Sequence, residues 1–315
     1  IHENVLQNCT GPANFILLGL SDEPVLQSIL FSTFLAIYVI TLVGNFIVIL
    51  LTMADPALQT PMYFFLRNLS FLEICYTTVN VPKMLENLLT GNKSISFIGC
   101  VMQTYFTFFL GGSECFILAS MAYDRYVAIC KPLQYPVLMS PKVYCTLSVA
   151  SWLGGSFMSC GHTSMVFTLS FCRSNVINHF FCDIPPLLKL ACEDTSRTEL
   201  AVFGTTMIFG TLPLVLIFMS YVGVIATILK ISSSEGRRKT FSICSSHLIV
   251  VTLFYGSACL IYLKPRSTYL PNTDKYVSLF YTVISPAFNP IIYSFLRNKE
   301  VQGALRRICK IKLFL

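Results

Sequence analysis

The sequence predicts an all-α integral membrane protein, a bundle of seven transmembrane helices with its N-terminus outside the cell and a short amphipathic C-terminal helix. The first supporting observation is composition. Of the 315 residues, 54% are hydrophobic and only 12% are charged, about half the charged fraction of about 25% in an average soluble domain. The second is a series of seven long apolar segments. The third is an uneven distribution of basic residues between the two sides of these segments.

The seven apolar segments follow one another with short connections, except for residues 168–199 between the fourth and the fifth. A membrane helix needs about 20 mostly apolar residues. The first segment is free of charge, whereas the second contains Arg67, Glu73 and Lys83. The expected spans are residues 25–53, 62–85, 97–129, 143–167, 200–229, 240–263 and 276–296. They divide the chain into an extracellular segment 1–24, a seven-transmembrane bundle 25–296 and a cytoplasmic amphipathic helix and tail 297–315.

The basic residues fix the expected orientation. An odd number of spans puts the two termini on opposite sides of the membrane. With the N-terminus outside, the cytoplasmic side holds 14 of the 22 basic residues, as the positive-inside rule requires. These are Arg67, Arg125, Lys131, Lys142, Lys230, Arg237, Arg238, Lys239, Arg297, Lys299, Arg306, Arg307, Lys310 and Lys312. The net charge of +7 is therefore interpreted as a rim facing anionic membrane lipid, not as a nucleic-acid patch.

The C-terminal stretch 297–311 alternates basic residues with apolar ones, the pattern of a helix lying on the inner leaflet. Cys309 within it is either a palmitoylation site or a free thiol. At the other end of the chain, Asn8-Cys9-Thr10 is a glycosylation sequon that is expected to be used on the lumenal side. Asn92-Lys93-Ser94 is a second sequon, in a short loop.

Thirteen cysteines are present. Four of them, Cys100, Cys172, Cys182 and Cys192, are expected outside, where disulfides persist. Four cysteines allow three pairings, and their spacing does not choose among them.

The third segment combines charge and small residues on one helix face. Thr107 and Arg125 are 18 positions apart, which is five full helical turns, or about 27 Å along the axis. Cys100 and Glu114 fall within about 20° of the same line. Charge at this depth is costly in lipid, so the face is expected to look into the bundle. In its outer half this face carries a candidate ligand wall: Thr104, Thr107, Phe108, Gly111, Gly112 and Cys115. The two glycines either leave room for a ligand or let helices pack closely.

Six motifs occur in order along the chain. They are Gly44-Asn45, PMYFFL at 61–66 followed by LSFLE at 69–73, MAYDRYVAIC at 121–130, Ser220-Tyr221, KTFSICSSH at 239–247 and PAFNPIIY at 286–293. Through these motifs the sequence resembles the rhodopsin-like G-protein-coupled receptors and, within them, the odorant receptors. One departure from the wider class agrees with this: residues 254–257 read FYGS, where other receptors usually carry Trp and Pro.

The resemblance implies two disulfides, Cys100–Cys182 and Cys172–Cys192, which would pin the long loop over the bundle. It also implies a ligand cavity shared by the outer halves of several segments. To the wall on the third segment it adds Thr205, Thr206, Phe209, Tyr255, Ala258, Cys259, Tyr262, Ser278, Leu279 and Thr282. Such walls suit a small, mostly hydrophobic odorant with one polar group. Amine receptors carry an Asp at Thr107, and the seventh segment has no interior Lys, so neither a protonated amine nor a retinal Schiff base is expected.

Deeper in the bundle, Glu73 and Glu114 are expected on neighbouring helices, near Asn45 and Asn289. Two close carboxylates cannot both be ionised cheaply, so one holds a proton or a cation lies between them. Related receptors bind sodium at the corresponding site. The hypothesis is a sodium or proton site that favours the resting state; the alternative is a structural hydrogen-bonded pair. No other cofactor is expected.

At the cytoplasmic end the resemblance implies contacts with a stimulatory G protein that raises cAMP. The residues concerned are Asp124, Arg125, Tyr126, Tyr221, His247 and Tyr293. Asp124 is expected to hold Arg125 in the resting state. His247 is either a protonation-sensitive bridge to the third segment or a neutral side chain bonded to a backbone carbonyl.

The favoured prediction is thus an odorant receptor in the plasma membrane. Two alternatives remain: an ion channel or transporter that uses Glu73 and Glu114, and a receptor of the same fold for a non-odorant metabolite. Inverted repeats, which would favour a transporter, are not visible. No catalytic motif points to an enzyme.

Overall fold

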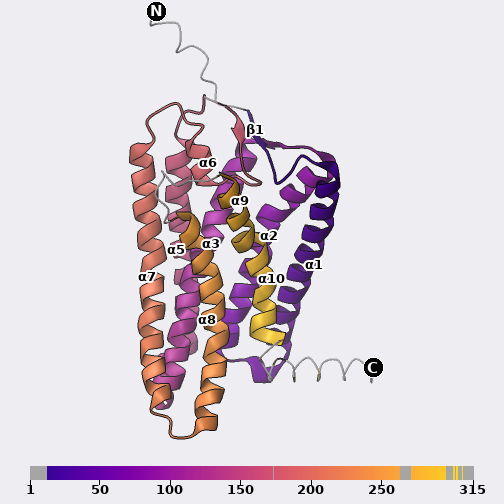
Figure 1. Ribbon diagram of the computed structural model, residues 1–315. Coiled ribbons are helices and arrows are strands. Elements are labelled where there is room, and N and C mark those ends of the chain that lie inside the picture. The colour runs from indigo at the N-terminus through magenta and orange to yellow at the C-terminus, as the bar shows by residue number, and fades with distance from the viewer. Residues whose placement is uncertain are drawn as a thin grey trace, which may run out of the picture.

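The computed structural model describes residues 13–172, 174–262 and 271–295, together with Val301, Gly303 and Arg307 of the C-terminal stretch. Its described part is an elongated bundle of helices, with short strands and loops gathered at one end (Figure 1). The expected glycosylation at Asn8, the unassigned Cys9 and Cys309 lie outside the described residues, as does most of the expected amphipathic helix.

The seven predicted spans are confirmed as seven helical segments. Six are single helices: α1 (Pro24–Ala54), α2 (Pro61–Thr90), α3 (Phe97–Cys130), α5 (Pro141–Phe167), α7 (Ser196–Leu229) and α8 (Ser234–Tyr262). The seventh runs through α9 (Pro271–Leu279), a π-helical turn (Phe280–Ile284), α10 (Ser285–Pro290) and a second π-helical turn (Ile291–Phe295). Taken singly, four helices in the described part are long and apolar enough to cross a membrane: those beginning at Pro24, Phe97, Ser196 and Ser234.

Local sequence signals explain where several of these helices begin and end. Proline, which is pre-organised for the first helical turn, opens α1, α2 and α5. The Ser96 side chain caps α3 by accepting from the Gly99 amide at 3.0 Å. Gly91, in the left-handed region with φ of 70°, ends α2. Shorter helices lie in the connections, namely the 3-10 helices Pro56–Leu58 and Pro132–Gln134, α4 (Tyr135–Leu138) and α6 (Ile184–Leu188).

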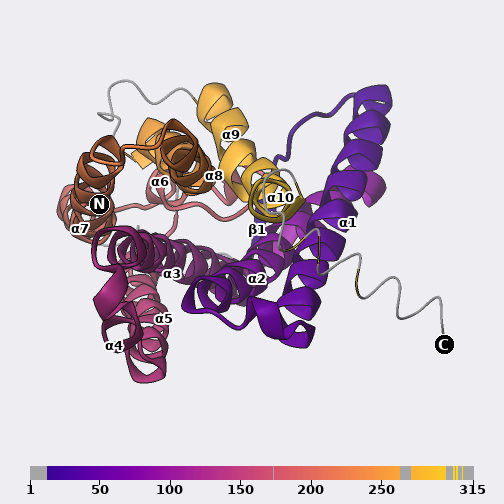
Figure 2. The same cartoon turned by 90° about the horizontal axis from the view of Figure 1, so that it is seen from below.

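Helix α3 occupies the centre of the bundle, where it packs against α2, α5 and α7 (Figure 2). The consecutive residues Ile117, Leu118, Ala119 and Ser120 are all buried, and at 100° per residue they point in directions spread around the helix axis. The expectation of a single inward face on this helix is therefore too narrow. The helix is enclosed on most of its circumference, so polar groups on several of its sides need partners inside the protein.

Helices α3 and α5 approach each other closely because small residues meet at their contact. A Cβ atom added to Gly155 would lie 2.5 Å from the Phe109 carbonyl oxygen and 2.5 Å from the Ser113 amide nitrogen. One added to Gly112 would lie 3.2 Å from the Cα of Gly155. Gly112 thus serves helix packing. The Cβ position of Gly111, by contrast, meets only the Tyr76 ring, at 4.0 Å.

A small sheet, which the sequence did not lead us to predict, closes one end of the bundle. Its strands β1 (Asn14–Leu17), β2 (Ser94–Ser96) and β3 (Val176–Ile177) lie in the order β2-β1-β3, with β1 antiparallel to β2 and parallel to β3. Phe15 and Leu17 of β1 are fully buried. The N-terminal segment is therefore built into this end of the bundle.

Both disulfides implied by the resemblance, Cys100–Cys182 and Cys172–Cys192, are present at the same end. We call it the disulfide end, and the opposite end the Arg125 end. At the Arg125 end, the Arg307 guanidinium donates to the Asp55 carboxylate at 2.6 and 3.0 Å. This hydrogen bond holds the pKa of Asp55 below its usual value and ties the C-terminal stretch to the α1–α2 connection.

The α3–α5 contact generates a stability prediction. In Gly155→Ala the new methyl group meets backbone atoms that cannot move aside, and overpacking of this kind costs about 1–3 kcal/mol. We expect a lower thermal unfolding temperature of the purified protein. Gly161→Ala is the matched control in the same helix, because its Cβ position has no atom within 4 Å. Equal unfolding temperatures for the two variants would contradict the predicted close contact.

Candidate functional site

The middle of the bundle holds a cluster of hydroxyl and thiol groups from four helical segments. The hydroxyl of Tyr255 on α8 lies beside the thiol of Cys115 on α3, and Cys259 lies one turn further along α8. Tyr76 of α2 and Tyr281 of the seventh segment lie close enough to interact with each other and with the α3 residues. We call these five residues the central cluster. Three of them were expected to bind ligand, whereas Tyr76 and Tyr281 were not.

Two predicted ligand residues on α3 form hydrogen bonds to neighbouring elements. Thr104 is fully buried and donates to the carbonyl oxygen of Cys182 at 2.9 Å. Thr107 donates to the side-chain oxygen of Asn80 on α2 at 3.1 Å. The side chain of Gln103 accepts from the Cys182 amide at 2.9 Å. Together with the Cys100–Cys182 disulfide, Gln103 and Thr104 fix the long loop to α3.

The predicted residues on α7 form a second group, on the side of α3 that faces α5. Thr205 lies 2.6 Å from Nε2 of His162 on α5, and the ring of Phe108 meets the same imidazole edge-on at 5.5 Å. Phe209 packs edge-on against Phe116 at 6.1 Å. Thr206 is half-buried on the same helix.

The predicted residues on the seventh segment lie below the long loop. Ser278 donates to the Asp274 carbonyl oxygen and lies 3.2 Å from Nε2 of His179. Thr282, fully buried, donates to the Ser278 carbonyl oxygen at 2.7 Å. Leu279 is buried, and Ala258 on α8 is half-buried. Tyr262 is the last residue of α8, and its side chain lies outside the part of the chain that the structure describes.

A lid, defined here as residues 178–183 of the long loop, covers the disulfide end of this region. His179, Phe180 and Phe181 are almost fully buried, and their rings pack against one another with centroids 4.5–5.0 Å apart. Lys275 of α9 donates to the Asn178 side chain and to the Gly19 carbonyl oxygen, both at 2.8 Å. The lid is therefore joined to α3, to α9 and to the N-terminal segment.

The predicted carboxylate layer adjoins the central cluster, since Glu114 directly precedes Cys115 on α3, and the structure brings its members together. Glu73 and Glu114 are both buried and interact electrostatically. The Asn289 amide donates to one Glu73 oxygen, and Asn45 also lies beside Glu73. The other Glu73 oxygen and the Asn289 side-chain oxygen have no partner among the described residues. Two unpartnered oxygens facing a second carboxylate form a site that a proton or a small cation would satisfy.

The predicted coupling residues also meet, at the Arg125 end. The Tyr221 hydroxyl lies 2.8 Å from Nδ1 of His247, and their rings stack. The Tyr293 ring lies 6.5 Å from the His247 ring. Arg125 is near enough to interact electrostatically with all three of these side chains. Tyr126 packs elsewhere, against Gly223 of α7, where a Cβ atom would lie 2.7 Å from its ring.

Asp124 does not pair with Arg125 as the sequence led us to expect. Its buried carboxylate accepts a hydrogen bond from the Tyr135 hydroxyl of α4 at 2.7 Å. The described residues contain no ion pair between Asp124 and Arg125. Burial, together with this carboxylate, raises the pKa of Tyr135, so the phenol keeps its proton and donates. One physical reason for the difference is position: neighbours in a helix point about 100° apart, so Asp124 faces α4 while Arg125 faces α7 and α8.

Comparison with known proteins identifies the family. A family model described as "Olfactory receptor" matches residues 34–312. The chain belongs to the olfactory receptor family. It is 52% identical to olfactory receptor 10A7 of Homo sapiens over 96% of both chains. It is 51% identical to the olfactory receptor-like protein OLF1 of Canis lupus familiaris, covering 97% of this chain and 98% of that protein.

The fold agrees with this membership. The crystal structure of squid rhodopsin matches with a TM-score of 0.72 over 90% of this chain and 81% of that chain, at 19% sequence identity. This likeness shows the rhodopsin-like seven-helix fold alone. The protein is thus a rhodopsin-like G-protein-coupled receptor of the multi-pass membrane type, and the family consists of receptors, not enzymes.

Several residues that shape the receptor's interior were missed from the sequence. Phe180 and Phe181 stand directly before Cys182, so an apolar pair beside a disulfide was the available signal for the lid. Tyr135 lies ten residues beyond Arg125, and Gly155 lies within an ordinary apolar run. For these two residues the sequence offered no signal, because their roles depend on which helix lies opposite.

The lid generates a pH prediction. Burial, and then the nearby Lys275, lowers the pKa of His179 to about 3, whereas an unfolded chain protonates histidine near 6.5. Between these values the unfolded state binds more protons, so stability falls as the pH drops below about 6.5. The His179 contribution to this loss by pH 5 is at most about 2 kcal/mol.

We therefore expect the thermal unfolding temperature of the purified receptor to fall between pH 7 and pH 5 by more than that of His179→Asn. The unfolding temperature of His179→Asn at pH 7 shows how much stability the substitution costs through lost packing alone. Parallel pH profiles for the two proteins would show that other groups cause the acid sensitivity.

Proposed function

We propose that the receptor binds a small, mostly hydrophobic odorant in the central cluster and activates a stimulatory G protein that raises cAMP. In this proposal it acts in the plasma membrane with the disulfide end outside. The supporting observation is the Cys115–Tyr255 pair, which joins α3 to α8 inside the bundle, with Tyr281 of the seventh segment in the same cluster. A ligand there would touch α3, α8 and the seventh segment together.

The chemistry of the central cluster favours a neutral ligand. Its polar groups are phenol hydroxyls and thiols, and the adjoining carboxylates of Glu114 and Glu73 already face each other. A few hydroxyl and thiol groups amid aromatic and aliphatic walls suit a mostly hydrophobic molecule with one polar group, because each buried polar group of a ligand needs a partner. Thr104 and Thr107 take part indirectly in this proposal, by holding the lid and α2.

A cAMP assay in cells tests the proposal. A panel of chemically diverse volatile compounds is applied to cells that express the full receptor, with and without the stimulatory G protein. A ligand-evoked cAMP rise that needs the G protein supports the receptor function. An ionic current that survives removal of the G protein would instead support the channel or transporter alternative, in which Glu73 and Glu114 form an ion path. Responses confined to non-volatile metabolites would favour the other alternative, a metabolite receptor.

Tyr255→Phe tests the ligand site. Removing the hydroxyl deletes one hydrogen bond to a polar odorant, worth about 1 kcal/mol, so we expect agonist potency to fall about fivefold without loss of surface expression. Thr252→Val on the exposed side of α8 is the control, since its hydroxyl only donates to the Leu248 carbonyl oxygen. Equal potency in both variants for every agonist would place the ligand elsewhere.

Glu114→Gln tests the carboxylate layer as a sodium or proton site that favours the resting state. The amide cannot hold a proton or balance a cation as the carboxylate does, so we expect basal cAMP to rise and its dependence on sodium to weaken. If basal activity and its sodium dependence are both unchanged, Glu73 and Glu114 form a purely structural pair. Surface expression, measured in parallel, separates signalling from folding.

Tyr135→Phe tests the coupling end. Without the phenol, the Asp124 carboxylate becomes free to attract Arg125 away from the Tyr221–His247 pair. We expect a reduced maximal cAMP response at unchanged odorant potency. Tyr144→Phe is the control, because this ring packs against Phe64 at 4.8 Å in the same half of the bundle. An unaltered maximum in Tyr135→Phe would mean that the Asp124 bond is structural only.

A further inference from the structure

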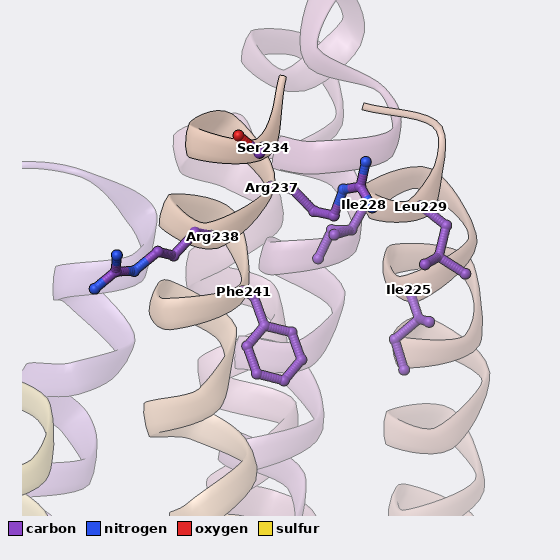
Figure 3. Close-up of a pocket in the computed structure, with 7 residues that line it drawn as sticks. All are labelled: Ile225, Ile228, Leu229, Ser234, Arg237, Arg238 and Phe241. Carbon is purple, nitrogen blue, oxygen red and sulfur yellow. The ribbon is translucent and has the colours of Figure 1, made fainter. Parts of the chain in front are cut away.

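A groove between α7 and α8 at the Arg125 end belongs neither to the central cluster nor to the Tyr221–His247 pair. It has a volume of about 440 Å³. Figure 3 shows its lining, which comes from the last turns of α7 and the first turns of α8: Ile225, Ile228, Leu229, Ser234, Arg237, Arg238 and Phe241.

The groove has an apolar part and a cationic part. Ile225, Leu229 and Phe241 form the apolar part, and they are 46%, 67% and 57% exposed. Arg237 and Arg238 form the cationic part, and none of the lining residues is acidic. In Figure 3 the side chain of Arg237 extends from α8 toward α7, whereas that of Arg238 extends on the opposite side of α8. Arg237 therefore supplies the charge within the groove.

Arg237 retains hydrogen-bonding capacity for a ligand. Its Nη2 donates to the Ile231 carbonyl oxygen at 3.2 Å, which positions the guanidinium at the mouth of the groove. A guanidinium has five N–H donors, and its planar fork suits phosphate oxygens. The hydroxyl of Ser234 lies on the same turn of α8. These groups fit a phosphate ester.

The apolar part continues into the lipid-facing surface of α7. Phe218, Met219 and Val222 are exposed on this helix and precede Ile225. In a membrane these side chains contact acyl chains, so a hydrocarbon chain can enter the groove without crossing a polar surface. An inorganic phosphate would leave the apolar walls uncovered. The charge and the continuous apolar surface together point to an amphiphile with an anionic head group.

We propose that the groove binds one anionic phospholipid from the leaflet around the Arg125 end. Its phosphate accepts hydrogen bonds from Arg237, and an acyl chain packs on Ile225, Leu229 and Phe241. In the orientation that the positive-inside rule predicts, this leaflet is the cytoplasmic one, which carries anionic lipid. The proposed lipid site does not depend on the proposed odorant or on coupling to a G protein.

Photolabelling tests this lipid site. The purified full-length receptor is placed in phosphatidylcholine vesicles that contain a trace of phosphatidylserine with a photoreactive acyl chain, and labelled peptides are mapped. We expect label on the peptides that contain residues 225–229 and 241. Unlabelled phosphatidylserine should displace it, whereas phosphatidylcholine and inorganic phosphate should not.

The variant Arg237→Gln should reduce this labelling about fivefold, the effect of one basic residue at an anionic membrane surface. Lys142→Gln, an exposed basic residue at the start of α5, is the matched control and should label as the unmodified receptor does. In Arg237→Lys, which keeps the charge but loses the planar fork, the amount of labelling should lie between those of Arg237→Gln and Lys142→Gln. The graded result separates loss of lipid binding from misfolding of a single variant.

Two outcomes would overturn the proposal. Equal labelling by a photoreactive phosphatidylcholine, unaffected by Arg237→Gln, would mean that the groove holds ordinary surrounding lipid. Displacement of the label by purified stimulatory G protein, combined with unchanged labelling of Arg237→Gln, would assign the groove to the G protein.

Discussion

The enclosure of α3 is the constraint on which the rest of the structure depends. A helix surrounded on most sides has no water for its polar side chains, so each must find a partner within the protein. At the disulfide end Thr104 finds the loop carbonyl of Cys182. In the middle Glu114 faces Glu73, and near the other end Asp124 finds Tyr135. The lid, the carboxylate layer and the coupling end are thus all fixed by polar groups on one helix.

Enclosure also explains why small residues matter at the α3–α5 contact. The two backbones come within the distance that a single methyl group would occupy, at Gly155. Close packing of this kind holds α3 in place along its outer half. Only with α3 held there can Gln103 and Thr104 position the lid, and only then does Cys115 meet Tyr255. The shape of the ligand region therefore depends more on how α3 packs against its neighbours than on the residues that line the region.

The sequence predicted the seven spans well, because a bilayer demands long apolar segments and leaves a strong signal. It also predicted that Asn45 and Asn289 lie near Glu73, because these residues lie in motifs that resemble a known family. The contact between Tyr221 and His247 was not predicted. The rotation of each helix about its own axis was harder to predict. Thr205 faces His162 on α5, and the apolar periodicity of α7 alone does not show which neighbouring helix each side of α7 faces. Strand β1 was missed since its partners lie far away in the sequence.

The seventh segment, like α3, contacts the lid, the carboxylate layer and the coupling end. Ser278 contacts the lid at His179, Asn289 donates to Glu73, and Tyr293 lies beside His247. Two π-helical turns interrupt this segment. The first, Phe280–Ile284, lies between Ser278 and Asn289, so it changes the direction in which Asn289 and Tyr293 point relative to Ser278. The seventh segment therefore contacts the lid, the carboxylate layer and the coupling end, so these three layers share one continuous stretch of chain in addition to α3.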